Sequence, residues 1–249
     1  RKEIKQVFGE FKPDFVISNS VSDFPVIKYA SKFFRFKSIY IDHVNLSGNV
    51  FKGLLSKNSL PLTLGSGIFG LSVDQIKKKL LDFFDAKVAL NLEQKKNLEK
   101  ITKNVYYIPN GIEPKKKSAD AGKSFREKYN LQGKFVYLYV GRLFERQKNI
   151  STLIKAFKNI NDSNAALVLV GEGPSKNDYI NMARGDNRII FTGAIDDKEL
   201  DDVYWGSNLL VMPSMWEGFS ITMLEASAHS LPMLVSHSAK PKDFEEEGI

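Results

Sequence analysis

Residues 212–226 read MPSMWEGFSITMLEA, and this stretch joins the end of a strand, a tight turn and the beginning of a helix. Glu217 stands in the turn and Glu225 inside the predicted helix, so two carboxylates flank one helix N-terminus. The first N–H groups of a helix have no partner within the helix, and the helix dipole adds partial positive charge there. We therefore expect an anion such as a phosphate at this turn. The backbone groups that would bind it belong to Gly218, Phe219 and Ser220.

A ligand that suits this arrangement is anionic in its middle and carries hydroxyls on both sides, as a nucleotide-sugar does. Each carboxylate can accept charge-assisted hydrogen bonds from such hydroxyls. The alternative is that Glu225 is merely solvated or ion-paired. Glu225 lies in the small, apolar run 223–228, and a carboxylate buried in such a run needs a partner, which favours a functional role.

Composition limits the classes of protein. The chain has 249 residues, enough for one or two domains, and 43% of them are apolar. It contains no cysteine, which excludes disulfides and cysteine-based metal sites. No secretory signal is visible and no apolar run is long enough to span a bilayer, so we expect the protein in the cytoplasm.

The net charge of +7 is unevenly distributed along the chain. Residues 1–110 carry 18 Lys and Arg against 10 Asp and Glu, whereas residues 111–249 carry 18 against 19. The basic cluster 77–79, beside the apolar residues of 80–84, suggests peripheral contact with an anionic membrane surface or an acidic lipid-linked acceptor. The alternative is a lysine-rich chain with ordinary solvated faces. Nucleic acid is not expected, because no reading motif accompanies the basic residues.

Short β-rich apolar runs alternate with helical patterns, which is typical of parallel sheets in an α/β fold. The predicted strands cover residues 14–19, 37–42, 86–91, 104–108, 135–140, 166–170, 188–192, 208–213 and 232–236. In the first part of the chain, the predicted helices cover residues 22–35, 73–84 and 93–101. Residues 113–123 form a polar, lysine-rich linker, and residues 44–72 are predicted as a loop or mobile helix.

Several motifs occur together in a fixed order. Residues 136–143 read VYLYVGRL and are followed by QKN at 147–149; residues 166–174 read ALVLVGEGP, and residues 189–195 read IIFTGAI. With the glutamate pair and IPNGIE at 108–113, they make most of the chain similar to the retaining GT-B glycosyltransferases of family 4, the glycosyl transferases group 1. The resemblance implies two Rossmann-like parallel-sheet domains that face a cleft.

The resemblance also implies two domains with different ligands, and that both are incomplete in this chain. Residues 1–111 correspond to part of an N-terminal acceptor-side domain, and residues 112–249 to a C-terminal nucleotide-sugar-binding domain that is truncated at its end. We expect the opening strands of the first domain and the last strands of the second to be missing. Within 228–237 the sequence departs from the family pattern, which leaves the last donor contacts open.

Glycosyl transfer requires stabilisation of the leaving diphosphate by a metal or by fixed positive groups. No Asp-x-Asp motif stands at the candidate site, and the pairs 196–197 and 201–202 are expected to begin or line a helix in solvent. Arg142 follows one strand and Lys148 begins the next helix, where open α/β sheets bind ligands. We therefore expect a site that uses neither metal nor cofactor, with Arg142 and Lys148 as a diphosphate clamp.

By the same resemblance, each remaining site residue has an expected role. Glu217 would hold hydroxyls of the donor sugar and act in catalysis, and Glu225 would hold the ribose. The loop from Gly193 to Ile195 would contact the base through its main chain, and His43 would face the donor sugar across the cleft. Gly218, Phe219 and Ser220 would meet sugar and phosphate. His229 and His237 are interpreted as structural.

The resemblance implies a hexosyltransferase-type enzyme that moves a sugar, with retention of anomeric configuration, from a nucleoside-diphosphate sugar, expected to be UDP-linked. The acceptor would be a glycan or lipid-linked molecule, as in the biosynthesis of bacterial cell-surface polysaccharides. One alternative is an inactive or binding-only GT-B remnant. Another is a nucleotide-sugar epimerase or a phosphorylase, whose site patterns differ from this one.

Overall fold

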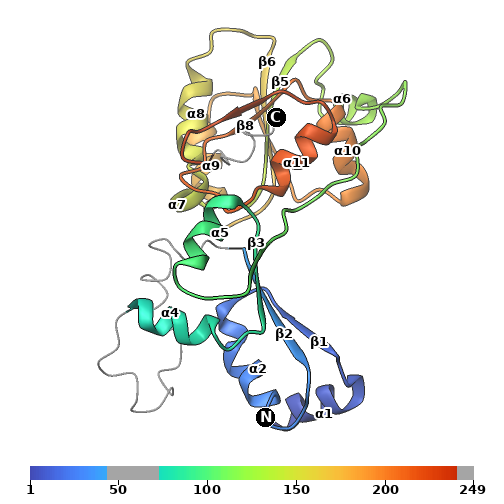
Figure 1. Cartoon of the computed structure of the whole chain (residues 1–249). Helices are drawn as coiled ribbons and strands as arrows, with labels where there is room; N and C mark the ends of the chain where they lie inside the picture. The colour runs from blue at the N-terminus through green and yellow to red at the C-terminus, as the bar shows by residue number, and fades with distance from the viewer. Residues whose placement is uncertain (44–72, 240–249) are drawn as a thin grey trace. The chain divides into compact units, whose positions relative to one another are not determined.

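The structure is a computed structural model that describes residues 1–43 and 73–239. It divides into two compact units, one within Arg1–Asn110 and the other within Gly111–Lys240, and each is described by itself (Figure 1). The boundary between them lies in the segment 108–113 that resembles an interdomain junction. The loop or mobile helix predicted over residues 44–72 lies outside the described residues. In the described ranges, every helix is too short or too polar to cross a bilayer.

The first unit is built on a parallel sheet whose described strands follow the order β1-β2-β3-β4. Its strands are β1 (Phe15–Ser18), β2 (Lys37–Asp42), β3 (Ala86–Ala89) and β4 (Val105–Tyr107). Its helices are α1 (Lys2–Phe11), the 3-10 turn η1 (Val21–Asp23), α2 (Phe24–Ala30), α4 (Val73–Leu81) and α5 (Leu92–Glu99). The four strands predicted here are confirmed. The helix predicted over 22–35 ends earlier, at Ala30, because Phe34 and Phe36 turn back to pack on Phe8 of α1.

The core of the first unit explains why the predicted membrane patch is not exposed as a whole. Leu80, Leu81 and Phe84 are 9%, 1% and 2% exposed and pack against α2 and the sheet. Lys77 is also buried, and Lys78 forms an ion pair with Asp82. Residues 77–84 therefore form the end of an amphipathic helix whose apolar side faces inward, and membrane contact through the basic first unit stays a prediction.

In its described part, the second unit has a parallel sheet in the order β7-β6-β5-β8-β9. Its strands are β5 (Phe135–Val140), β6 (Ala165–Val170), β7 (Ile189–Gly193), β8 (Leu209–Met212) and β9 (Met233–Val235). Its helices are α6 (Lys123–Lys128), α7 (Glu145–Lys148), α8 (Ile150–Lys158), α9 (Lys176–Ala183), α10 (Asp197–Trp205) and α11 (Ile221–Ala228). The five strands predicted for this part of the chain are confirmed.

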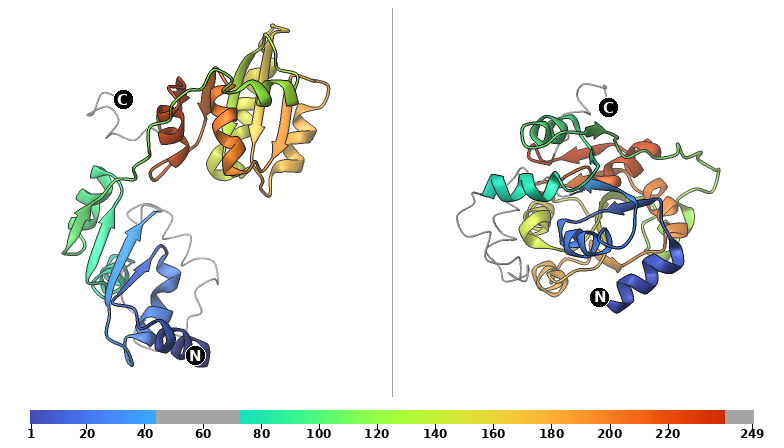
Figure 2. Two further views of the ribbon diagram at one scale, coloured as in Figure 1. Left: turned by 90° about the vertical axis from the view of Figure 1, so that its right-hand side faces the viewer. Right: turned by 60° about the horizontal axis from the view of Figure 1, so that its bottom comes forward.

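Helices cover both faces of this sheet: α8 and α9 lie on one side, and α6, α10 and α11 lie on the other (Figures 1 and 2). Every residue of β6 is buried, as the apolar run 166–170 predicts for an inner strand of a parallel sheet. From β5 the chain proceeds outward through β6 and β7, and then crosses to β8 and β9 on the other side. The switch point therefore lies between β5 and β8, where open α/β sheets bind their ligands.

Candidate functional site

Two loops meet at the carboxyl edge of the second sheet, next to the switch point. We call residues 141–149, which follow β5 and include α7, the β5 loop, and residues 213–220, which follow β8, the β8 loop. The amide of Met215 donates to the carbonyl of Gln147 at 2.7 Å, and Gln147 Nε2 donates to the carbonyl of Trp216 at 3.3 Å. Asn149 Nδ2 donates to the carbonyl of Pro213 at 3.3 Å. The two loops are thus fixed together by main-chain carbonyls.

An enclosed ion pair joins the same two loops. Lys148 Nζ lies 2.6 Å from Glu217 Oε1, and only 16% and 8% of the two side chains are exposed. Lys148 reaches this position because α7 ends there and Asn149 adopts a left-handed conformation with φ 50°, which redirects the chain into α8. An ammonium group has three N–H donors, so Lys148 can bind Glu217 and also donate to an anion.

Arg142 lies at the beginning of the β5 loop. Its guanidinium packs 5.6 Å from the ring centre of Phe144, the residue is exposed, and among the described residues it forms no ion pair. Its carbonyl accepts a hydrogen bond from the Tyr139 hydroxyl at 3.1 Å. Burial raises the pKa of Tyr139, with the charge of Glu217 as a smaller cause, so this hydroxyl stays protonated as a donor. The main chain of Arg142 is therefore anchored while its charged end is accessible.

Two glycines let the neighbouring loops approach this edge closely. A Cβ on Gly171, whose φ is 133°, would lie 2.0 Å from the Gly141 carbonyl oxygen. A Cβ on Gly173 would lie 2.3 Å from the Leu143 carbonyl oxygen. Both contacts are with backbone, so no side chain can move away to accommodate the added atom. The glycine loop in residues 171–174 is thus a packing requirement for the chain around Arg142.

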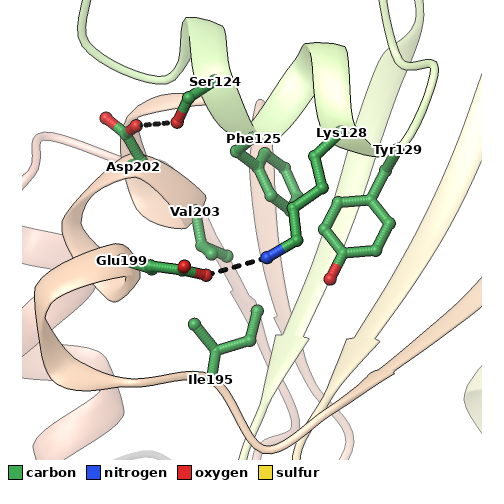
Figure 3. A pocket seen from close by; sticks show the side chains of 8 residues that line it. All are labelled: Ser124, Phe125, Lys128, Tyr129, Ile195, Glu199, Asp202 and Val203. Atoms are coloured by element: carbon green, nitrogen blue, oxygen red, sulfur yellow. Dashed lines mark hydrogen bonds and ion pairs between the residues drawn. The ribbon is translucent and has the colours of Figure 1, made fainter.

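Gly193 and Ile195 are predicted to contact a base; Gly193 is the last residue of β7, and Ile195 lies in the loop that follows it. Gly193 has φ 77°, and its carbonyl accepts from the Gly171 amide at 2.8 Å, which connects this loop to the edge of the sheet. Ile195 lines a pocket of about 180 Å³ between α6 and α10, and Figure 3 shows its side chain below the ion pair of Lys128 with Glu199. Because cavities for drug-sized ligands measure about 300–1,000 Å³, this pocket is too small for a nucleotide.

Helix α11 begins directly after the β8 loop. Ser220 is its N-cap, with an extended backbone, and its side chain accepts from the Met223 amide. Gly218 and Phe219 precede it in the β8 loop. Glu225 is half-buried one turn further along, and its Oε2 accepts a hydrogen bond of 2.6 Å from the Tyr204 hydroxyl. The structure therefore gives Glu225 the partner that a carboxylate in an apolar run requires.

His43 belongs to the first unit, at the end of β2. It is exposed, and its Nε2 lies 3.3 Å from Asn19 Oδ1. Its expected role across a cleft stays a prediction. His229 is a buried structural residue, in line with its interpretation from the sequence, and His237 is exposed.

The two acidic pairs begin and line α10, as predicted; residues 196 and 197 are exposed, whereas residues 201 and 202 are half-buried and have structural partners. Asp196 caps α10 by accepting from the Lys198 amide at 2.9 Å. Asp202 accepts from the Gly122 amide and the Ser124 hydroxyl, and these two hydrogen bonds hold the pKa of Asp202 below its usual value. Asp201 lies 3.0 Å from both His229 Nε2 and Lys115 Nζ. Asp201 and Asp202 therefore fix α10 to its neighbours.

Tyr204, Gln147 and Asn149 had no predicted role. Gln147 and Asn149 flank Lys148 in the quoted QKN motif, but their partners are main-chain carbonyls 64 to 69 residues away, which no local pattern reveals. Tyr204 had one usable signal: it lies in the last turn of the helix that precedes β8, and a buried tyrosine needs an acceptor for its hydroxyl.

Comparison with known proteins identifies the family. The family model described as Glycosyl transferases group 1 matches residues 122–249. An uncharacterized glycosyltransferase of Methanocaldococcus jannaschii is 28% identical over 247 residues, which cover 93% of this chain and 57% of that protein. The UDP-Gal:alpha-D-GlcNAc-diphosphoundecaprenol alpha-1,3-galactosyltransferase of Escherichia coli is 30% identical over 179 residues, which cover 64% of this chain and 46% of that enzyme.

Among solved structures, HepE of Anabaena in complex with UDP-glucose matches with a TM-score of 0.73 at 17% identity, over 95% of this chain and 63% of that one. At this identity the match shows the fold alone, which is the GT-B arrangement of Rossmann-like domains. The chain spans about half the length of the two curated relatives described above. Because the family model matches half of the sequence and its residues include the glutamate pair, this chain belongs to the glycosyl transferases group 1.

Proposed function

We propose that this protein is a retaining, metal-independent glycosyltransferase that moves a sugar from a nucleoside-diphosphate sugar, expected to be UDP-linked, to a glycan or lipid-linked acceptor. The observation that carries the proposal is the 2.6 Å ion pair of Lys148 with Glu217 at the switch point, beside the exposed Arg142. Family membership supports the reaction class. The names of the Escherichia coli relative and the HepE complex support a UDP-linked donor.

Arg142 and Lys148 are the proposed diphosphate clamp. As the bond between the anomeric carbon and the phosphate oxygen breaks, negative charge grows on the leaving diphosphate. A guanidinium can donate two parallel N–H bonds to phosphate, and the ammonium of Lys148 adds a positive charge in an enclosed place where it is weakly screened. Fixed charges of this kind stabilise the transition state because they need no reorganisation.

The two glutamates would act on opposite ends of the donor. Glu217, held by Lys148, would accept hydrogen bonds from hydroxyls of the transferred sugar and stabilise the positive charge that develops on its ring. Glu225, whose Oε1 has no hydrogen-bond partner among residues 1–43 and 73–239, would accept from the ribose hydroxyls with this oxygen. Ser220 and the residues before it would place backbone N–H groups near the sugar and phosphate. The loop from Gly193 to Ile195 would meet the base.

Retention follows if the acceptor attacks from the side of the leaving group. The acceptor oxygen forms its bond to the anomeric carbon on the face from which the diphosphate departs, and the departing phosphate oxygen takes the acceptor proton. In this scheme no side chain forms a bond to the sugar. His43 of the first unit is proposed to face the donor sugar, and the first unit is proposed to carry the acceptor. The protein is proposed to act in the cytoplasm, with peripheral membrane contact if the acceptor is lipid-linked.

The proposal is tested with the complete protein and a panel of nucleotide-sugars in a thermal-shift assay. A ligand present at 100 times its dissociation constant adds about 2.7 kcal/mol of stability, so the true donor should stand out. The selected donor is then incubated with candidate acceptors, and NMR of the product gives its anomeric configuration. Stabilisation by no nucleotide-sugar, or an inverted product, would contradict the proposal.

A further inference from the structure

Glu225 is hydrogen-bonded to an uncharged protein group, the hydroxyl of Tyr204. The proposed reaction gives this hydroxyl no role. Tyr204, on α10, is 1% exposed, and its hydroxyl donates to Glu225 Oε2 at 2.6 Å. Burial raises the pKa of Tyr204, with the hydrogen bond to Glu225 as the next cause, so the phenol keeps its proton and donates. One oxygen of Glu225 is thus occupied by protein.

The ring of Tyr204 is itself held in place from behind. The imidazole of His229 stacks on it with ring centres 4.9 Å apart and planes inclined by 29°. His229 Nδ1 lies 2.6 Å from the carbonyl oxygen of Glu225, and its Nε2 lies 3.0 Å from Asp201 Oδ1. Both partners are acceptors, so the imidazole lies between them and donates to at least one. Through it, α10 is joined to the last turn of α11, next to the backbone of Glu225.

We propose that Tyr204 is a positioning residue that fixes the carboxylate of Glu225 so that its second oxygen, Oε1, accepts hydrogen bonds from the ribose hydroxyls of the donor. This inference rests on the proposed function, which assigns the ribose to Glu225. A glutamate side chain has several rotatable bonds, and immobilising it on binding costs conformational entropy. A carboxylate already bound at one oxygen loses less, so the ligand gains more affinity from each hydroxyl.

The inference predicts which part of the ligand should lose its contribution when Tyr204 is changed. Tyr204→Phe keeps the ring and its stacking on His229 but removes the hydroxyl. The probes are UDP and 2′,3′-dideoxy-UDP, which differ only in the ribose hydroxyls, and titration calorimetry on the complete protein gives their affinity ratio. Both ligands are measured on the same preparation, so a partly unfolded fraction cancels in the ratio. We expect Tyr204→Phe to lower the preference for UDP by about tenfold.

Tyr179→Phe is the matched control. Tyr179 is also 1% exposed, and its hydroxyl donates to a carboxylate oxygen, Glu145 Oε2, at 2.8 Å on α7. The control variant loses the same kind of hydrogen bond in the same unit without touching Glu225. Its affinity for UDP can change, but its preference for UDP over the dideoxy analogue should stay within about twofold of the wild-type value.

Glu225→Gln separates failure of this inference from failure of the proposed function. If Glu225→Gln reduces the preference for UDP but Tyr204→Phe does not, Glu225 binds the ribose and Tyr204 does not position it. If neither variant changes the preference, or if the protein binds no UDP, the assignment of the ribose to Glu225 is wrong and the inference falls with it. Equal losses in Tyr204→Phe and Tyr179→Phe would reduce Tyr204 to a general structural residue.

Discussion

The β8 loop around Glu217 and helix α11 around Glu225 hold the same kind of side chain in two different ways. Glu217 is bound by an ammonium, with 8% of the side chain exposed, whereas Glu225 is half-buried and bound by a phenol. The hydrogen bonds have the same length, 2.6 Å, but only the first partner carries charge.

This difference matches the demands that the proposed reaction makes on the two ends of the donor. Positive charge develops on the sugar and negative charge on the diphosphate. A carboxylate can stabilise the first and a neighbouring cation the second. The ribose does not change during the reaction, so a carboxylate with a neutral donor is sufficient to recognise its hydroxyls. The predictions below test whether the two glutamates differ in this way.

The largest effect is expected for Glu217→Gln. This variant removes a charge that acts in the transition state and leaves Lys148 without its counter-ion. We expect turnover to fall by about a hundredfold or more, and the free energy of unfolding to fall by about 3 kcal/mol because an enclosed charge loses its partner. Steady-state kinetics and denaturant unfolding measure the two effects.

Glu172→Gln is the control for Glu217→Gln. Glu172 pairs with Lys176 at the same distance, 2.6 Å, but with 53% of the glutamate side chain exposed. An exposed pair contributes about 1 kcal/mol or less to stability, so this variant should remain close to wild type. If the free energy of unfolding falls equally in both variants, enclosure of the Lys148–Glu217 pair does not contribute to stability.

The next effect concerns the clamp. Arg142→Ala should lower turnover by about a hundredfold, the size seen when one preorganised charge-stabilising donor is removed. The fold should be intact, because the structural contact of Arg142 is through its carbonyl, which alanine retains. Arg146→Ala, an exposed arginine on α7, is the matched control in steady-state assays. Wild-type turnover in Arg142→Ala would remove this residue from the site.

A smaller effect is expected for Glu225→Gln, because its contacts should be equally strong in the ground state and the transition state. The Michaelis constant for the donor should rise by about tenfold, with turnover nearly unchanged. A loss of turnover as large as that of Glu217→Gln would mean that the phenol-bound carboxylate also acts on the reacting sugar.

The smallest effect is expected from a chelator. If Arg142 and Lys148 supply the positive charge that the diphosphate requires, treatment of the complete protein with EDTA should leave its turnover within about twofold of the untreated value. Loss of activity that magnesium or manganese restores would show that the two cations are not sufficient.

The sequence predicted the framework of this edge well, because each part of it has a local signal. The apolar run 166–170 predicts a strand, and residues 212–226 predict the strand end, turn and helix that carry the two glutamates. Ser220 stands directly before α11, and serine is a common N-cap residue.

Contacts between distant segments were beyond the reach of these patterns. Lys148 and Glu217 are 69 residues apart, and only the order of the strands brings their loops together. Tyr204 and Glu225 lie on two successive helices that cover one face of the sheet, and the direction of a buried hydroxyl depends on packing. For the same reason, the sequence did not show that the apolar neighbours of the basic cluster 77–79 form the core of the first unit.

Titration calorimetry with a nucleoside diphosphate tests whether Glu217 and Glu225 bind different parts of the donor. The ligand is UDP, and the proteins are wild type, Glu217→Gln and Glu225→Gln, each in its complete form. We predict that Glu225→Gln weakens UDP binding by about tenfold, because UDP retains the ribose. Glu217→Gln should leave UDP binding almost unchanged, because UDP lacks the transferred sugar. Equal weakening in both variants would contradict the separate roles of the two glutamates.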